Sequence, residues 1–415
     1  MTVLGGAPKR QRMSDLSPAA TILRDLIRCP SVTPLEGGAL DYLENRLKPL
    51  GFVVTRKTFS SPNTPDVENL YARLGDKSPN LCFAGHTDVV PTGDEESWSA
   101  GPFSGDVNDG IMFGRGAVDM KGGIACFLAA VEAHLSAGKT IPGSVSFLIT
   151  GDEEGPAVNG TSAILDWLME QGEKIDACVV GEPTNPEVIG DAIKIGRRGS
   201  VSGTITVTGV QGHAAYPHLA DNPARGITSL VSALLSEPFD NGTDNFQPTN
   251  LEVTSIDTGN PASNVIPAAA TALFNVRFND TWTANSIKIE IERRLTLAAS
   301  DKTLRPDPES GARSPIQWAV EYAQRPSHVF LTKDDRLIAS LSAAVETVTQ
   351  KSPELSTGGG TSDARFIKDV CPVVEFGLVG QTMHQIDERV PLSDLDLLTK
   401  IYVEFLSVYF AGNTK

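Results

Sequence analysis

Apolar runs in this chain repeatedly end at residues that can bind a metal ion or move a proton. The runs 81–85, 145–150 and 177–181 are typical of strands buried on both faces, and helical segments alternate with them. One helix is expected to begin at Ser17-Pro18, with Ser17 as its N-cap, and a second to run from about Leu35 to Leu50. This alternation predicts a largely parallel sheet flanked by helices, with its strand ends meeting at one edge. Six residues stand at the end of an apolar run or just after one: His86, Asp119, Glu153, Glu154, Glu182 and His384.

The pattern changes after Gly199, where apolar and polar residues begin to alternate. Such alternation predicts half-exposed strands, and helical stretches are expected between them. The α/β pattern resumes later, with a helix expected over 333–349 and a strand over 370–377. The strands expected in the middle of the chain cover 201–209, 251–256 and 271–278, and the helices lie near 225–236 and 285–298.

These two patterns predict two domains, which the length of 415 residues also favours. An α/β catalytic domain with a mixed, mostly parallel sheet would comprise residues 17–198 and 329–415. An α+β domain, residues 199–328, would be inserted in it. The last part of the insert, 301–328, is rich in proline and charge and is expected to be a loop and linker. Residues 1–16 are expected to form a flexible tail.

Composition limits the partners. The net charge of −16 repels nucleic acid and anionic lipid, so neither is expected to bind. The five cysteines are odd in number and form no C-x-x-C pair, which favours a reducing compartment over a disulfide framework. No segment approaches the roughly 18 apolar residues of a membrane span, and the tail lacks the apolar stretch of a signal peptide. A cytoplasmic protein is therefore expected.

His86 follows the strand 81–85 directly, and Asp88 stands two residues further on. We expect His86 to bind a metal ion and the Asp88 carboxylate to hold its other ring nitrogen, since this contact fixes the tautomer of a metal-binding imidazole. Asp119 stands where a glycine-rich loop meets an alanine-rich helix. Its two oxygens could bridge two metal ions about 3.5–4 Å apart, although an ordinary helix cap is the alternative for this residue alone.

Glu153 and Glu154 are adjacent, and neighbouring carboxylates repel unless a cation or a proton holds them. A metal ion at Glu154 and a catalytic base at Glu153 would satisfy both. Glu182 and His384 each come after a further strand and complete the set. Two imidazoles and four carboxylates match the ligands of two zinc ions plus one carboxylate that remains as base. This set predicts hydrolysis of an amide.

These motifs resemble those of the di-zinc aminoacylase/carboxypeptidase-type metallohydrolase family. The shared features are His-x-Asp after a strand, an Asp-Met-Lys-Gly loop, Asp-Glu-Glu-Gly and a late histidine, and the resemblance covers about residues 17–412. Within the family, narrower motifs resemble the branch that acts on N-succinyl-LL-2,6-diaminopimelate. These narrower motifs lie at 105–123, which contains Arg115-Gly116, and at 181–184, 197–200, 212–218, 264–267 and 359–366.

The resemblance implies two Zn²⁺ ions per subunit, which Co²⁺ can replace. His86 and Glu182 would hold one ion, and Glu154 and His384 the other. Asp119 would bridge the two ions.

The resemblance also implies a cis peptide between Asp119 and Met120, and a homodimer formed through the inserted domain. His213 would reach the partner's active site and donate a hydrogen bond to the developing oxyanion; a simple turn residue is the alternative. Domain closure would use hinges near 198–200 and 328–330.

An anionic substrate needs arginine side chains or backbone N–H groups to bind its carboxylates. For Arg198 alone, a plain surface charge is the alternative. The candidate substrate-binding residues are Arg197, Arg198, Tyr216, Asn264, Arg277, Gly360 and Thr361.

Two other functions stay open. A related N-acyl amino acid deacylase, such as one acting on acetylornithine, or a di-zinc carboxypeptidase would keep every metal ligand; the motifs at 197–200 and 360–366 argue against both. A zinc-bound binding or scaffold protein that has lost catalysis is the other alternative. The presence of Glu153 argues against it, because loss of activity usually removes the base.

Overall fold

The computed structural model describes residues 16–300 and 315–411, so nearly all of the predicted tail and the first half of the predicted linker lie outside the described residues. The chain divides into two compact units. The first contains the residues up to Ile195, Thr332–Ser356 and those from Ser362 on, and the second contains Gly196–Leu331 and Thr357–Thr361. Within the described ranges, no helix is both long and apolar enough to cross a membrane.

The first unit is built on an eight-stranded sheet. Its strands are β1 (Val53–Phe59), β2 (Val67–Leu74), β3 (Asn80–His86), β6 (Ser144–Thr150), β7 (Ala177–Val180), β8 (Ala192–Lys194), β17 (Glu354–Ser356) and β18 (Val373–Glu375). Their order is β1-β2-β6-β3-β7-β18-β8-β17. The four central strands β6, β3, β7 and β18 run parallel, whereas β1 and β2 are antiparallel additions at one edge. Every residue of β3 and β6 is buried, as expected for strands covered on both faces.

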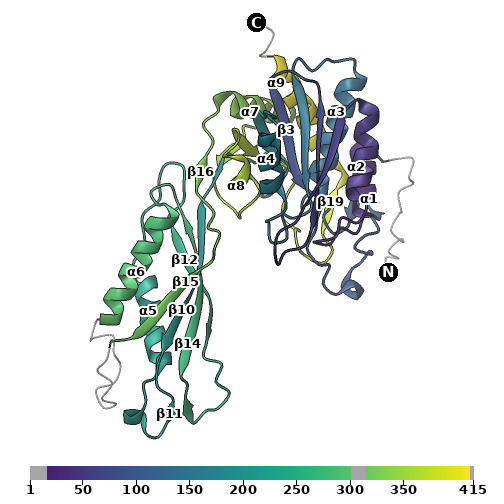
Figure 1. Cartoon of the computed structure of the whole chain (residues 1–415). Coiled ribbons are helices and arrows are strands. Elements are labelled where there is room, and N and C mark those ends of the chain that lie inside the picture. The colour runs from purple at the N-terminus through teal and green to yellow at the C-terminus, as the bar shows by residue number, and fades with distance from the viewer. Residues whose placement is uncertain (1–15, 301–314, 412–415) are drawn as a thin grey trace, which may run out of the picture. The chain divides into compact units, whose positions relative to one another are not determined.

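Helices lie on both sides of this sheet (Figure 1). They are α1 (Pro18–Ile27), α2 (Ala39–Leu47), α3 (Lys121–Ser136), α4 (Thr161–Glu170), α7 (Asp335–Thr349), α8 (Ala364–Ile367) and α9 (Leu392–Ala411). The α3 helix packs against α1 and α9, and α9 also packs against α7. An aromatic cluster joins these layers: the ring of Phe127 in α3 stacks on Phe83 in β3 at 4.5 Å, and Tyr402 of α9 contacts both rings edge-on.

The second unit is an antiparallel sheet with helices on one face (Figure 1). Its main elements are β10 (Gly199–Thr208), α5 (Pro223–Leu235), β12 (Asn250–Asp257), β14 (Ala269–Phe278), α6 (Ala284–Ser300) and β15 (Gln317–Tyr322). The strand order is β12-β14-β10-β15. Alternate residues of β10 and β14, such as Ile205 and Phe274, face the helices and are buried with Leu230 and Ile291. The unit therefore has a hydrophobic core of its own.

Short elements complete both units. In the first unit these are the 3₁₀ turns η2 (Lys48–Leu50) and η3 (Glu95–Ser97), and a small sheet of β4 (Val107–Asn108), β5 (Ile111–Phe113) and β19 (Arg389–Pro391). In the second unit they are the pairs β9 (Gly196–Arg197) with β16 (Phe330–Leu331) and β11 (Gly212–His213) with β13 (Val265–Ile266), and the 3₁₀ turn η4 (Pro217–Leu219).

The mixed α/β fold expected from the sequence is confirmed, with two local corrections. A helix was expected to begin near Leu35, but α2 begins only at Ala39 because Gly37 and Gly38 both adopt left-handed backbone angles. The segment expected to be only loop and linker contains β15. This strand alternates buried and exposed residues and pairs with the edge of β10, a long-range partner that local composition did not reveal.

The close packing of α3 against the end of β7 yields a test. A Cβ at Gly123 would lie 2.3 Å from the carbonyl oxygen of Gly181. We expect Gly123→Ala to cost about 1–3 kcal/mol of overpacking, more than the roughly 1 kcal/mol that alanine gains in a helix. Urea unfolding of chelator-treated protein measures this. Gly101→Ala is the matched control, because its nearest neighbour is 3.8 Å away; equal stabilities of the two variants would contradict the prediction.

Candidate metal and catalytic site

The central strands bring the predicted metal ligands to one edge of the sheet. His86 is the last residue of β3, Glu182 follows β7, and the pair Glu153 and Glu154 follows β6. Because β3, β6 and β7 are parallel neighbours, their carboxyl ends meet at the same edge. Asp119 lies just before α3, and its peptide bond to the next residue is cis, as the resemblance implied.

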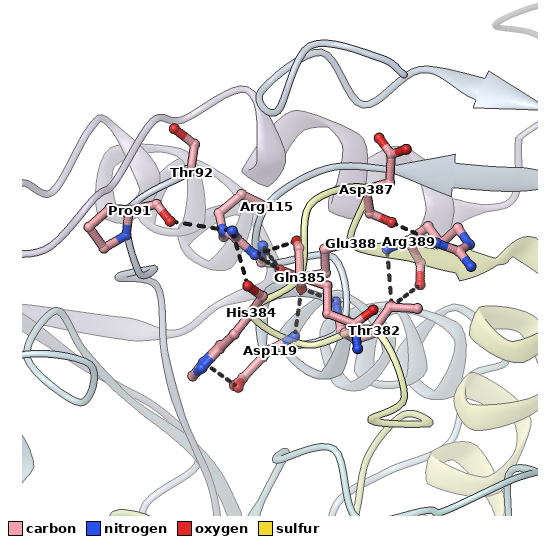
Figure 2. Close-up of polar contacts among 12 residues, drawn as sticks. Pro91, Thr92, Arg115, Asp119, Thr382, His384, Gln385, Asp387, Glu388 and Arg389 are labelled. Atoms are coloured by element: carbon pink, nitrogen blue, oxygen red, sulfur yellow. Dashed lines mark hydrogen bonds and ion pairs between the residues drawn. The ribbon is translucent and has the colours of Figure 1, made fainter. Parts of the chain in front are cut away.

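Asp119 lies between two imidazoles. Its Oδ1 is 3.2 Å from Nε2 of His86. Its Oδ2 is 3.2 Å from Nε2 of His384, a contact that Figure 2 shows. Glu182 Oε1 is 3.8 Å from the His86 nitrogen, and Glu154 Oε1 is 2.8 Å from the His384 nitrogen. Each oxygen of one carboxylate thus faces one histidine, and each histidine has a further carboxylate beside it.

The arrangement fits a metal centre. One ligand atom from each of His86, Glu153 and Glu182 lies within 4.8 Å of the other two, and the same holds for His86, Asp119 and Glu154. Imidazole nitrogens and carboxylate oxygens are the ligands that zinc takes in hydrolases. These residues could therefore hold divalent cations close together.

Burial and the surrounding charges shift the pKa values of the carboxyl groups. Burial and neighbouring carboxylates raise the pKa of Glu153 to about 8, although the charge of His86 opposes this rise. Burial, reinforced by the charge of Asp119, raises the pKa of Glu182 well above its usual range. Burial would also raise the pKa of Asp119, but its contacts with His384 and His86 lower it. Bound cations would favour the ionised form of every one of these carboxylates.

The pKa values of the two histidines are raised as well. Burial alone would lower the pKa of His86, but its contact with Asp119 and the charge of Glu182 raise it well above its usual range. Hydrogen bonds with Asp119 and Glu154 raise the pKa of His384 to about 10. A metal ion must displace these protons, so metal binding competes with protonation.

The contact between Asp88 and His86 differs from the one expected. The backbone carbonyl of Asp88 lies 2.9 Å from Nδ1 of His86, whereas its carboxylate is 3.6 Å away. That carboxylate instead accepts hydrogen bonds from the backbone N–H groups of Glu153 and Glu154, at 3.3 and 2.9 Å. Asp88 thus orients the imidazole through its main chain and holds the Glu153–Glu154 turn through its side chain.

Three arginines predicted to bind substrate gather in the second unit. Arg277 Nη1 donates to Oγ1 of Thr361 at 2.8 Å, and Arg198 Nη1 donates to Oδ1 of Asn250, also at 2.8 Å. Burial, with the charges of Arg198 and Arg197, lowers the pKa of Arg277. Guanidinium groups close enough to repel favour an anion placed between them.

The loop carrying Gly360 lies beside this cluster. Arg197 Nη1 donates to the Gly358 carbonyl at 3.2 Å, so the arginine holds the loop by its backbone. A Cβ at Gly360 would meet no atom within 4 Å, which leaves open space at this position.

His213, Tyr216 and Asn264 come together in the β11–β13 region of the second unit. The carbonyl of Asn264 accepts from the N–H of Ala214 at 2.9 Å, and the His213 and Tyr216 rings are 5.6 Å apart. Nδ1 of His213 accepts from the N–H of Ala215 at 3.1 Å. Its Nε2 therefore carries the proton in the neutral ring and can donate a hydrogen bond. All three side chains are exposed.

One pair of site residues was missed by the sequence reasoning. Arg115 and Glu388 form an ion pair of 2.9 Å and contact the backbone of Asp119 and His384 (Figure 2). Arg115 stood in a motif of the resemblance without a role, and no local pattern marks Glu388, which comes four residues after His384.

Comparisons with known proteins agree with this architecture. Residues 82–408 match the model of peptidase family M20/M25/M40, and the chain belongs to this family of metal-dependent hydrolases of peptide and amide bonds. The structure resembles an M20 family metallo-carboxypeptidase, Sso-CP2 from Sulfolobus solfataricus, with a TM-score of 0.74 and 18% identity over 95% of this chain and 100% of that one.

Two further solved structures show the same fold. The di-peptidase Dug1p from Saccharomyces cerevisiae has a TM-score of 0.70 and 16% identity, covering 95% of this chain and 96% of that one. The Bacillus subtilis YXEP protein, a dinuclear metal binding peptidase of the M20 family, has a TM-score of 0.65 and 14% identity, covering 95% and 98%.

The raised pKa of His384 predicts how pH affects the metal-free protein. A group with a pKa of about 10 in the folded state, against about 6.5 when unfolded, stabilises the fold fully below pH 6.5. That stabilisation is lost as the pH rises through 10. We expect the difference in unfolding free energy between wild type and His384→Gln to be largest below pH 6.5 and to shrink steadily toward pH 10. Chemical unfolding at a series of pH values, with chelator present, measures it; a difference that grows with pH would refute the prediction.

Proposed function

We propose that the protein hydrolyses N-succinyl-LL-2,6-diaminopimelate to succinate and LL-2,6-diaminopimelate, the reaction of succinyl-diaminopimelate desuccinylase in lysine and diaminopimelate biosynthesis. This substrate carries three carboxylates. The arginine cluster of Arg197, Arg198 and Arg277 beside Thr361 is the observation that carries the proposal. A protein with a net charge of −16 places three guanidinium groups together where an anionic ligand compensates their repulsion.

We propose that the site holds two Zn²⁺ ions, which Co²⁺ can replace. His86 and Glu182 would hold one ion, Glu154 and His384 the other, and Asp119 both. The separate approach of each Asp119 oxygen to one histidine supports the bridging role. When bound, the two ions supply a water-derived nucleophile at neutral pH and polarise the amide carbonyl.

Glu153 is proposed as the general base and acid. Burial raises its pKa to about 8 in the metal-free protein, and bound cations would favour the ionised carboxylate, the form that accepts a proton. It would take a proton from the attacking water and deliver it to the leaving amine nitrogen. The Asp88 carboxylate accepts hydrogen bonds from the backbone of the turn that carries Glu153, and these bonds fix the position of the turn.

His213 is proposed as the donor to the developing oxyanion, acting across a homodimer formed through the second unit. The hydrogen bond from Ala215 to its Nδ1 supports this role, because it leaves the Nε2 proton for the substrate. Tyr216 and Asn264, which lie beside it, are proposed to contact the succinyl end.

A dipeptidase or carboxypeptidase is the second candidate. Solved relatives named as a di-peptidase and a metallo-carboxypeptidase favour it. A terminal peptide carboxylate would also suit the arginine cluster, so the substrate itself must be tested.

The substrate proposal predicts an order of rates. With zinc-loaded protein, kcat/KM should be largest for N-succinyl-LL-2,6-diaminopimelate, compared with acetylornithine and a dipeptide. Arg277→Met should raise KM about 10- to 100-fold, because a charge-assisted hydrogen bond contributes roughly 1.5–3 kcal/mol. Arg293→Met, on the solvent-exposed part of α6, is the matched control. A higher kcat/KM for acetylornithine or the dipeptide would end this proposal.

Mixing two inactive variants tests Glu153 and His213 together. Glu153→Gln should lower kcat about 10²–10⁴-fold, and His213→Ala about 10²–10³-fold. If the partner subunit's His213 completes each site, equal mixing with subunit exchange restores about a quarter of wild-type activity, since half the dimers are mixed and one of their two sites is intact. Continued inactivity of the mixture, with exchange verified by mass spectrometry, would place His213 in its own subunit's site.

A further inference from the structure

The carboxylate of Glu388 is surrounded by four hydrogen-bond donors. Its Oε1 accepts from the backbone N–H groups of Val118 and Asp119 at 2.9 and 3.2 Å. Its Oε2 accepts from the N–H of Gly116 at 3.0 Å and from Nη1 of Arg115 at 2.9 Å. A single side chain therefore holds the backbone of the loop that presents Asp119.

Arg115 extends these contacts to two other loops (Figure 2). Its guanidinium donates to the carbonyl oxygens of Gln385 at 3.0 Å and His384 at 3.5 Å, both in the loop that precedes Glu388. It also donates to the Pro91 carbonyl at 3.3 Å, in the loop that follows β3. The pair thus connects the loop after β3, a strand that ends at His86, with the segments before α3 and before β19, which carry the predicted ligands Asp119 and His384.

Both members of this pair are withdrawn from solvent. Arg115 is 2% exposed and Glu388 is 0% exposed. Breaking a buried pair by removing one partner is costly, yet such a pair adds little net stability compared with apolar residues of similar volume. The pair therefore calls for a role beyond stability, and its contacts with the backbone of Asp119 and His384 supply one.

We propose that Arg115 and Glu388 form a positioning pair that sets the spacing between Asp119 and His384 and thereby controls binding of the second of two metal ions. Of the three ligands proposed for the first ion, His86 ends β3 and Glu182 follows β7, and only Asp119 is held by this pair. This inference rests on the proposed function only in that the site takes two divalent cations.

The geometry makes Glu388→Gln a sharp variant. Each oxygen of Glu388 accepts from two donors, so a glutamine amide turned either way places its own NH₂ group against two N–H donors. The shape is preserved while the acceptor pattern is broken. Arg115→Lys is the second variant. It keeps the positive charge, but a lysine ammonium cannot bind the carbonyls of both loops at once as the guanidinium does.

Zn²⁺ titration of the chelator-treated full chain, by calorimetry with a competing chelator, measures both binding steps. We expect wild type to bind two ions. Glu388→Gln should bind the first with little change, since Asp119 is the only one of its ligands that the pair holds, and the second about 10- to 100-fold more weakly, because the pair holds both Asp119 and His384. Arg115→Lys should show a smaller loss of the same kind. The visible spectrum of the Co²⁺-loaded protein should lose the contribution of one site. Arg46→Met, which breaks the Arg46–Glu132 pair on α2 and α3, is the control and should leave both steps unchanged.

Three results would overturn the inference. Both ions could bind Glu388→Gln as they bind wild type, or both could weaken equally, which would indicate a general structural defect. A variant that fails to fold is covered by hydrogen exchange on metal-free wild type: we expect the amides of Val118 and Asp119 to be protected, and exchange as fast as in exposed loops would refute the proposal. Wild type that binds two ions but hydrolyses no amide would overturn the proposed function and leave the positioning role intact.

Discussion

Asp119 accepts a contact from each of two imidazoles, one at each carboxylate oxygen, and the rest of the site is arranged around it. Carboxylates packed this closely repel one another unless protons or cations lie between them. In the metal-free protein the protons are shared with His86 and His384, whose pKa values are raised. Two divalent cations would neutralise the same carboxylates. Protons and metal ions therefore compete for these residues, and the pH sets the balance between the protonated and the metal-bound form.

The fold explains how such repelling groups are held together. Each central strand is buried along its length and anchored in the ladder of its neighbours, so the residue at its end has little freedom to move away. The aromatic packing of Phe83, Phe127 and Tyr402 fixes α3 and α9 against the same sheet. Packed strands and helices thereby hold the repelling carboxylates of the site in place. Residues proposed to bind substrate lie instead in the second unit, which has its own core.

The sequence predicted the buried strands and the start of the first helix because each of these depends on residues close together in the chain. Buried strands read as continuous apolar runs, and Ser17 marked the start of α1, where its side chain accepts from the Ala20 N–H. The predictions failed where a distant partner decides. The strand β15 exists through its pairing with β10, and the Asp88 carboxylate turned to the backbone N–H groups of Glu153 and Glu154, which lie over 60 residues away.

The sequence by itself determined which chemical groups are available and which strand ends carry them, because residue type and hydrophobic period are properties of short segments. Only the tertiary structure decided how these groups are oriented. Glu388 shows the difference: it lies 269 residues from Asp119 in sequence, yet its carboxylate binds the N–H of Asp119. No periodicity records such a contact, since it arises from long-range packing that brings two loops to one buried position.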